Sequence, residues 1–142
     1  MASLNKLVDM LVQHEGMRTK PYEDTVGHLT IGVGRNLDSM GLSHDEIYYM
    51  LKNDIRRCEE ELTNSFRWFS KLDGVRQHAM INLCFNLGIS RLRKFKRALA
   101  AMEANDFEEA ADEFLDSKWA QQVGQRAMEV TYMIRFGEYY EN

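Results

Sequence analysis

The most informative part of the chain spans residues 14–34 and has the sequence HEGMRTKPYEDTVGHLTIGVG. Glycines alternate there with β-branched residues, and the only proline of the chain, Pro21, lies in it. This composition predicts a small twisted hairpin or three-stranded ribbon over residues 17–36. The stretch also holds Glu15, at the end of an apolar helical pattern, and Asp24, in a glycine-rich turn. The predicted β element and two candidate acid-base groups therefore lie within the same short stretch of sequence.

The rest of the chain is predicted to be helical. Apolar residues at helical spacing predict an amphipathic helix over residues 3–14, with Ser3 as its N-cap. Ser43 and Glu46 form a capping box at the start of a helix of about five turns. Residues 70–73 are expected to open another helix by similar capping. Further helices are expected at about 92–103, 106–117 and 125–135.

Length and composition favour one folded domain. The chain has 142 residues, of which 44 % are hydrophobic and 28 % charged, close to the average for globular proteins. The predicted fold class is α+β, mainly α, with a small β ribbon and a helical lobe joined by a long helix. Cys58 and Cys84 are too few for a disulfide framework and are expected to be reduced. No segment approaches the ~18 apolar residues of a membrane span, and no secretory signal is visible.

The net charge of −4 conceals two blocks of opposite sign. Residues 71–97 carry seven basic residues and one acid, and residues 101–142 carry ten acids and three bases. Each block is typical of solvated helix surface. The alternative is that the basic block faces an anionic polymer and bounds the substrate side.

Glu15 and Asp24 suggest glycoside hydrolysis, which requires one protonated carboxylic acid and one ionised carboxylate across a cleft. Composition alone is a weak argument, because the chain has 22 acidic residues and most acids are solvated surface. Other chemistries lack their motifs: the second histidine of His-Glu-x-x-His and the third glycine of a dinucleotide fingerprint are both absent. No base-reading motif surrounds residues 91–97. The sequence therefore predicts no metal, no cofactor and no nucleic-acid partner.

Residues 14–34 resemble the signature of phage-type lysozymes, the endolysins of the T-even phage kind, in which Glu-Gly is followed by an acidic turn and Thr-Ile-Gly-x-Gly. Residues 79–88 resemble the central helix of that family, and residues 117–119 and 125–127 its C-terminal landmarks. The resemblance covers nearly the whole chain. It implies a single lysozyme-like catalytic domain over residues 1–142 with two lobes. The β-containing lobe is expected at about 15–60, and the helical lobe at about 61–142 together with helix 3–14.

The resemblance also implies roles for individual residues. Glu15 matches the catalytic acid, Asp24 the second carboxylate and Thr30 the hydroxyl residue that positions water. For an acid and a base to coexist, Glu15 is expected in the drier environment and Asp24 in an open turn. Phe85 matches a residue of the sugar groove, although plain core packing remains an equal alternative. Arg126 matches an arginine that supports the catalytic glutamate.

The implied function is that of an endolysin, a muramidase that hydrolyses the β-1,4 bond between N-acetylmuramic acid and N-acetylglucosamine in peptidoglycan. Direct displacement by water with inversion is favoured by the resemblance. A monomer is expected, without stable membrane insertion, held in the host bacterial cytoplasm until lysis and then acting on the cell wall. Its release is expected to depend on a separate pore-forming protein.

Two alternatives stay open at the level of sequence. One is a module that binds the cell wall or another polyanion without catalysis. The other is a lytic transglycosylase, which would cleave the same bond without water and would need neither Asp24 nor Thr30. The chain is also shorter than its best-known relative between Asn36 and Ser43, so part of the cleft rim is expected to be missing there.

Overall fold

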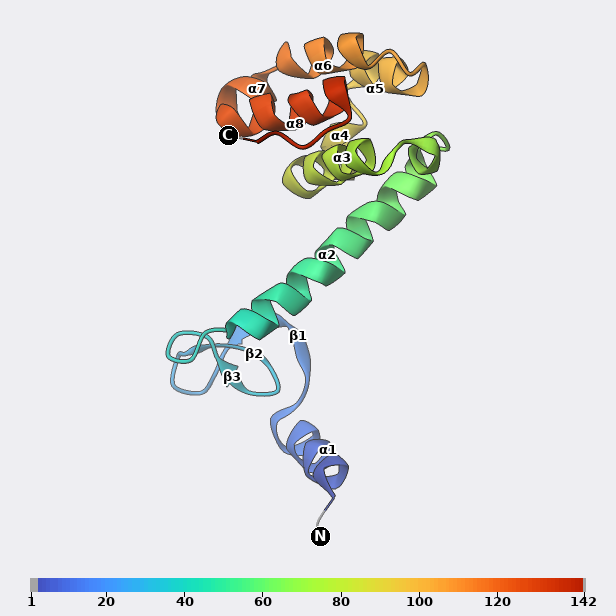
Figure 1. The fold of residues 1–142 in the computed structure, drawn as a ribbon. Helices are drawn as coiled ribbons and strands as arrows, with labels where there is room; N and C mark the ends of the chain where they lie inside the picture. Colours follow the sequence, from blue (N-terminus) through green and yellow to red (C-terminus); the bar gives the residue numbers. More distant parts are fainter. Residues whose placement is uncertain (1–2, 142) are drawn as a thin grey trace. The chain divides into compact units, whose positions relative to one another are not determined.

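The computed structural model describes residues 3–141 and contains, within that range, eight α-helices, one 3-10 helix and one three-stranded sheet. Figure 1 shows the elements in chain order. This architecture confirms the predicted α+β, mainly α, fold class. The chain divides into two compact units, Met1–Tyr49 and Met50–Asn142. The predicted lobe boundary near residue 60, and the grouping of helix 3–14 with the helical lobe, stay predictions.

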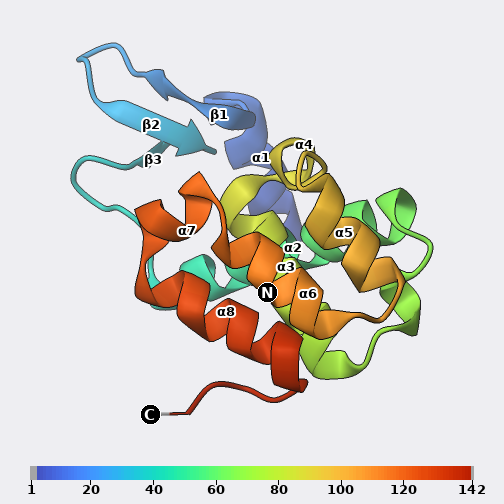
Figure 2. The same cartoon turned by 90° about the horizontal axis from the view of Figure 1, so that it is seen from above.

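The first unit contains a helix followed by the β ribbon. Helix α1 (Leu4–Glu15) begins at Ser3, whose hydroxyl accepts a hydrogen bond from the Lys6 amide, and ends at Gly16. Strands β1 (Arg18–Glu23), β2 (Leu29–Gly32) and β3 (Arg35–Asn36) then pair antiparallel in sequence order, as Figure 2 shows. The predicted helix, its cap and the ribbon are all confirmed.

Helix α2 (His44–Ser65) begins at the predicted capping box. The Ser43 amide donates to Glu46 Oε1 at 2.8 Å, and the Glu46 amide donates to Ser43 Oγ at 3.2 Å. Arg35 forms a bidentate pair with Glu46, donating to its two carboxylate oxygens at 2.8 and 2.7 Å. It also donates to the Gly41 carbonyl at 3.0 Å. The Arg35 guanidinium, helped by Ser43, lowers the pKa of Glu46 to about 2. Hydrogen bonds from Arg35 and the capping box therefore hold the short segment between β3 and α2 in place.

The second unit is a set of packed helices. Its largest fully buried side chains include Leu62, Phe69, Met80 and Phe114, and α6 packs against both α5 and α8, as Figures 1 and 2 show. The 3-10 turn η1 spans Phe69–Lys71. The helices after η1 are α3 (Gly74–Leu87), α4 (Ile89–Leu92), α5 (Lys96–Glu103), α6 (Phe107–Leu115), α7 (Lys118–Val123) and α8 (Gln125–Phe136).

Three details of the helical prediction were wrong. The helix expected at 92–103 is interrupted, because the Lys94 and Phe95 amides donate to carbonyls three residues back, which turns the chain so that Leu92 and Phe95 both reach the core. Helix α3 begins after Asp73, which caps it, and not at Ser70, which lies in η1. Helix α7 was not expected, since six residues are too few to show a period.

None of the helices within residues 3–141 combines the length and the apolar composition needed to cross a membrane.

Arg76 links the start of α3 to the end of α8. Its Nε donates to the Ile134 carbonyl at 2.6 Å and its Nη2 to the Arg135 carbonyl at 3.1 Å. The same guanidinium pairs with Asp73 and lies 3.8 Å from the centre of the Phe107 ring. These contacts satisfy carbonyls at the C-terminal end of α8 that have no partner inside the helix.

Replacement of Arg76 by Met is expected to lower the free energy of unfolding by about 2 kcal/mol, because charge-assisted hydrogen bonds to two helix-end carbonyls are lost. Chemical denaturation followed by circular dichroism measures the change. Arg91→Met, at an exposed position of α4, is the matched control and should change stability by less than ~0.5 kcal/mol. Equal effects of the two substitutions would show that the Arg76 link contributes nothing specific.

Candidate functional site

Asp24 organises the turn between β1 and β2. Its Oδ1 accepts hydrogen bonds from the amides of Val26 at 3.0 Å and His28 at 2.8 Å. Its Oδ2 lies 3.6 Å from Nδ1 of the His28 ring. The His28 amide, more than the other donors, lowers the pKa of Asp24 below its usual value. The carboxylate is therefore ionised at neutral pH, as expected for a residue in an open turn.

Thr30 is connected to Asp24 through the backbone of His28. The Thr30 hydroxyl donates to the His28 carbonyl at 2.9 Å, and the Asp24 amide donates to the same carbonyl at 2.9 Å. Thr30 lies in the central strand β2, paired with Tyr22 and Asn36, and is 3 % exposed. Because its proton is engaged by a carbonyl, the Thr30 hydroxyl can serve a further partner only as an acceptor.

Glu15 is the last residue of α1, and its carboxyl group lies against the backbone of Gly34 in the ribbon. A Cβ atom at Gly34 would lie 3.0 Å from Glu15 Oε2 and 3.3 Å from its Cδ. Gly34 also has a φ of +68°, a conformation that favours glycine. Gly34 is what the first unit places against the carboxyl group of Glu15. The expectation that Glu15 lies in a drier environment than Asp24 stays a prediction.

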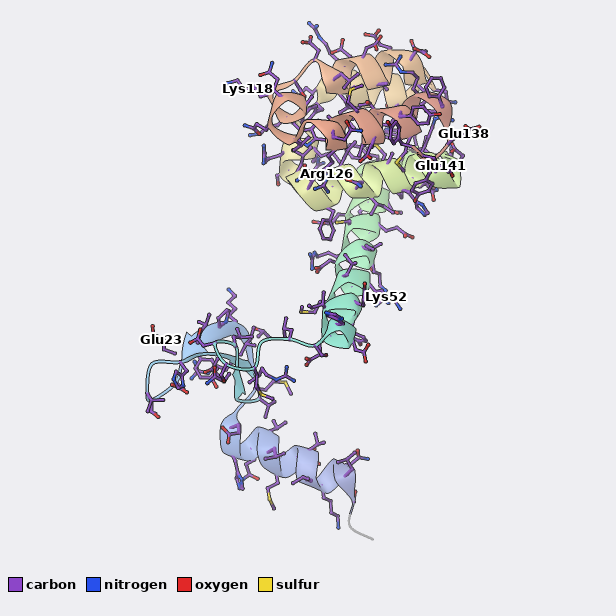
Figure 3. The ribbon with its side chains drawn as sticks, turned by 60° about the vertical axis from the view of Figure 1, so that its left-hand side comes forward. Glu23, Lys52, Lys118, Arg126, Glu138 and Glu141 are labelled. Carbon is purple, nitrogen blue, oxygen red and sulfur yellow. The ribbon has the colours of Figure 1, made fainter. Side chains whose placement is uncertain are left out.

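In the second unit, Arg126 and Phe85 border one cavity of about 400 Å³. Arg126, labelled in Figure 3, donates from Nε to Asn82 Oδ1 at 3.0 Å. Within the second unit the Phe85 side chain borders this cavity, and both its predicted contact with sugar and the alternative of core packing stay open. His78 and Tyr139 border the same cavity and hydrogen-bond to each other through the imidazole Nδ1 and the phenol oxygen.

The predicted site residues fall in two groups. Glu15, Asp24 and Thr30 belong to the first unit, whereas Phe85 and Arg126 belong to the second. Within the first unit, Asp24 and Thr30 both donate to the His28 carbonyl, and Glu15 contacts Gly34. The catalytic roles, and the support of Glu15 by Arg126, stay predictions.

Two residues of the site were missed by the sequence reasoning. His28 acts through its main chain, which any residue type supplies, so the sequence carries no signal for it. Gly34 was interpreted as a glycine needed for ribbon conformation. The second glycine of the Thr-Ile-Gly-x-Gly pattern indicates that a side chain is not tolerated at Gly34. The pattern does not indicate which side chain packs against that glycine.

The comparison with known protein families supports the resemblance. The family model described as phage lysozyme matches residues 12–132, most of the chain. The chain belongs to the phage lysozyme family. It is accordingly a lysozyme, a glycoside hydrolase, and membership implies peptidoglycan as its substrate. The identification of the family from residues 14–34 is thus confirmed.

Individual relatives agree with this assignment. Two proteins of Dictyostelium discoideum named probable T4-type lysozyme 1 and 2 are 27 % and 29 % identical to the chain, over 94 % of this chain and 96 % of each relative. The pre-baseplate central spike protein Gp5 of Enterobacteria phage T4 is 31 % identical over 92 % of this chain, which covers 28 % of that protein. The similarity to Gp5 is therefore confined to one part of a longer protein.

The role of the Asp24 carboxylate in the turn can be tested apart from catalysis. Asp24→Asn keeps an oxygen that can accept from the Val26 and His28 amides, whereas Asp24→Ala removes it. We expect amide hydrogen exchange at these two positions to stay slow in the Asn variant and to become at least ~10-fold faster in the Ala variant, as measured by NMR. Equally slow exchange in both variants would mean that the carboxylate does not hold the turn.

Proposed function

We propose that this protein is an endolysin that hydrolyses the β-1,4 bond between N-acetylmuramic acid and N-acetylglucosamine. In this proposal Glu15 is the general acid, Asp24 the second carboxylate and Thr30 the residue that positions water. The observation that carries the proposal is that the Asp24 amide and the Thr30 hydroxyl both donate to the carbonyl of His28. This arrangement fixes an ionised carboxylate and a hydroxyl acceptor on one rigid ribbon.

The hydrogen-bond roles fit activation of a water molecule. The Asp24 carboxylate can only accept, and the Thr30 hydroxyl already donates its hydrogen bond to the His28 carbonyl. A water molecule held between these two acceptors would donate one hydrogen bond to each and keep a lone pair free for the anomeric carbon. As the water attacks, one of its protons would pass to the Asp24 carboxylate. The charge of Asp24 would in addition stabilise the oxocarbenium-like transition state. Attack by such a water on the face opposite the leaving group inverts the configuration.

Glu15 is suited to the other half of the reaction, protonation of the leaving oxygen. It ends a helix, and its contact with Gly34 limits the positions that its carboxyl group can take. A proton donor must be held within hydrogen-bond reach of the leaving oxygen, so a restricted carboxyl group loses less entropy on reaching that geometry. Phe85 is proposed to contact sugar, supported by the cavity that it borders.

The biological role follows from the activity. Cleavage of peptidoglycan by a phage enzyme lyses the host cell, so we propose that the protein is held in the host cytoplasm until a separate pore-forming protein gives it access to the wall. A monomer suffices for this proposal, because Glu15, Asp24, Thr30 and Phe85 all come from one chain.

Replacement of Glu15 by Gln is expected to lower the rate of peptidoglycan hydrolysis by at least ~10³-fold while leaving thermal unfolding unchanged, because the amide cannot supply the proton. Release of reducing ends from purified cell walls measures the rate. Glu23→Gln, at the exposed end of β1 and labelled in Figure 3, is the matched control. Wild-type hydrolysis by the Glu15 variant would remove Glu15 from the reaction.

The effect of the contact between Glu15 and Gly34 on activity can be distinguished from the effect of backbone strain by comparing alanine substitutions at two glycines. Gly34 and Gly32 both have a φ of +68°, but a Cβ atom meets Glu15 only at Gly34 and meets nothing within 4 Å at Gly32. Alanine at either position should cost about 1–2 kcal/mol of stability. We expect Gly34→Ala alone to lower kcat, by at least ~10-fold, because it displaces the carboxyl group. Equal kcat values for the two variants would contradict a positioning role for this contact.

A further inference from the structure

Three donor groups of the second unit meet between α2 and α3, and none of them lines the cavity bordered by Phe85 and Arg126. They are the thiols of Cys58 and Cys84 and the carboxylate of Glu61, and one donor atom from each lies within 4.8 Å of the others. Cys58 and Glu61 are three residues apart on α2, which places them on the same face of the helix. Cys84 comes from α3.

Burial distinguishes this cluster from surface acids. Cys58 is 4 % exposed and Cys84 is 2 % exposed, while Glu61 is partly exposed. Two buried thiols alone would be explained as small apolar groups of the core. The carboxylate of Glu61 beside these thiols cannot be explained in the same way, because bringing a charge next to buried apolar groups costs free energy. Glu61 has no ion pair within residues 3–141, and Arg57, which precedes it by one turn of α2, pairs with Asp54 instead.

The donor set matches the ligands of a borderline-soft divalent cation. Zinc is bound by thiolates at about 2.3 Å and by carboxylates at about 2.0–2.2 Å in a tetrahedron, so its ligand atoms lie roughly 3.5–3.8 Å apart. A separation of up to 4.8 Å is close to that spacing. Rotation of the partly exposed Glu61 side chain would shorten the distances that involve its carboxylate. Two thiolates and a carboxylate also leave one position for water.

Two other uses of the thiols fit less well. Cys58 and Cys84 are both buried, which argues against a reactive nucleophile, because reactive cysteines are partly exposed. A disulfide between Cys58 and Cys84 would leave the position of Glu61 without explanation. Both cysteines are free thiols in the structure.

We propose that Cys58, Glu61 and Cys84 form a binding site for one zinc ion that joins α2 to α3. Binding releases the two thiol protons to solvent and leaves the oxidation state of every atom unchanged. The sequence alone predicted no metal, because that prediction was based on histidine spacing and on a search for local motifs. The cluster forms only when two helices pack, so neither pattern could reveal it.

The full-length protein, reduced and freed of metal with a chelator, is titrated with Zn²⁺, and bound metal is counted by mass spectrometry after dialysis. Titration with Cd²⁺ reports thiolate ligation directly through charge-transfer absorption. Four proteins are compared: wild type, Glu61→Gln, the double variant Cys58→Ala with Cys84→Ala, and Glu60→Gln. Glu60 is an exposed neighbour of Glu61 on α2, so its substitution is the matched control for the loss of a charge.

We expect one zinc ion per chain in the wild type and in Glu60→Gln, with a rise in the thermal unfolding temperature on binding. Affinity should fall at least ~10-fold in Glu61→Gln, which leaves the buried core untouched, and the cadmium band should vanish in the double variant. Retention of zinc by the double variant would place the metal elsewhere, for instance on surface histidines. The proposal would be overturned if the zinc affinity of Glu61→Gln were unchanged. It would also be overturned if the reduced wild type bound no zinc and instead formed a disulfide with oxidised glutathione.

Discussion

The main chain of His28 is the constraint on which the proposed catalytic ribbon depends. Its amide donates to the Asp24 carboxylate, and its carbonyl accepts from both the Asp24 amide and the Thr30 hydroxyl. The backbone of one residue therefore sets the position of a charge and the direction of a hydroxyl group. Because the Asp24 turn closes a strand pair, a change in either side chain disturbs the local fold as well as the chemistry. The fold of this turn and its proposed function depend on the same hydrogen bonds.

The two carboxylates differ in what holds them. Asp24 is fixed by amide donors that favour its charged form, which supports its proposed role as the ionised partner. Glu15 is held by shape, since its carboxyl group lies against a residue without a side chain.

Much of the fold could be predicted from local patterns. The N-cap at Ser3, the capping box at Ser43 and the glycine-rich ribbon were all confirmed, because each depends on residues within a few positions of one another. The break between α4 and α5 was missed, since it results from the burial of Leu92 and Phe95 against helices distant in sequence. The contacts within the site were missed for the same physical reason: Gly34 meets Glu15 across 19 residues of chain.

The central claim is that the protein cleaves the glycosidic bond with water activated by Asp24 and Thr30. The most direct test digests purified peptidoglycan in water enriched in heavy oxygen and analyses the products by mass spectrometry. The account predicts N-acetylmuramic acid reducing ends that each carry one heavy oxygen atom from solvent. Anhydromuramic products without label would contradict it, since they form when the sugar's own hydroxyl displaces the leaving group and no water is used.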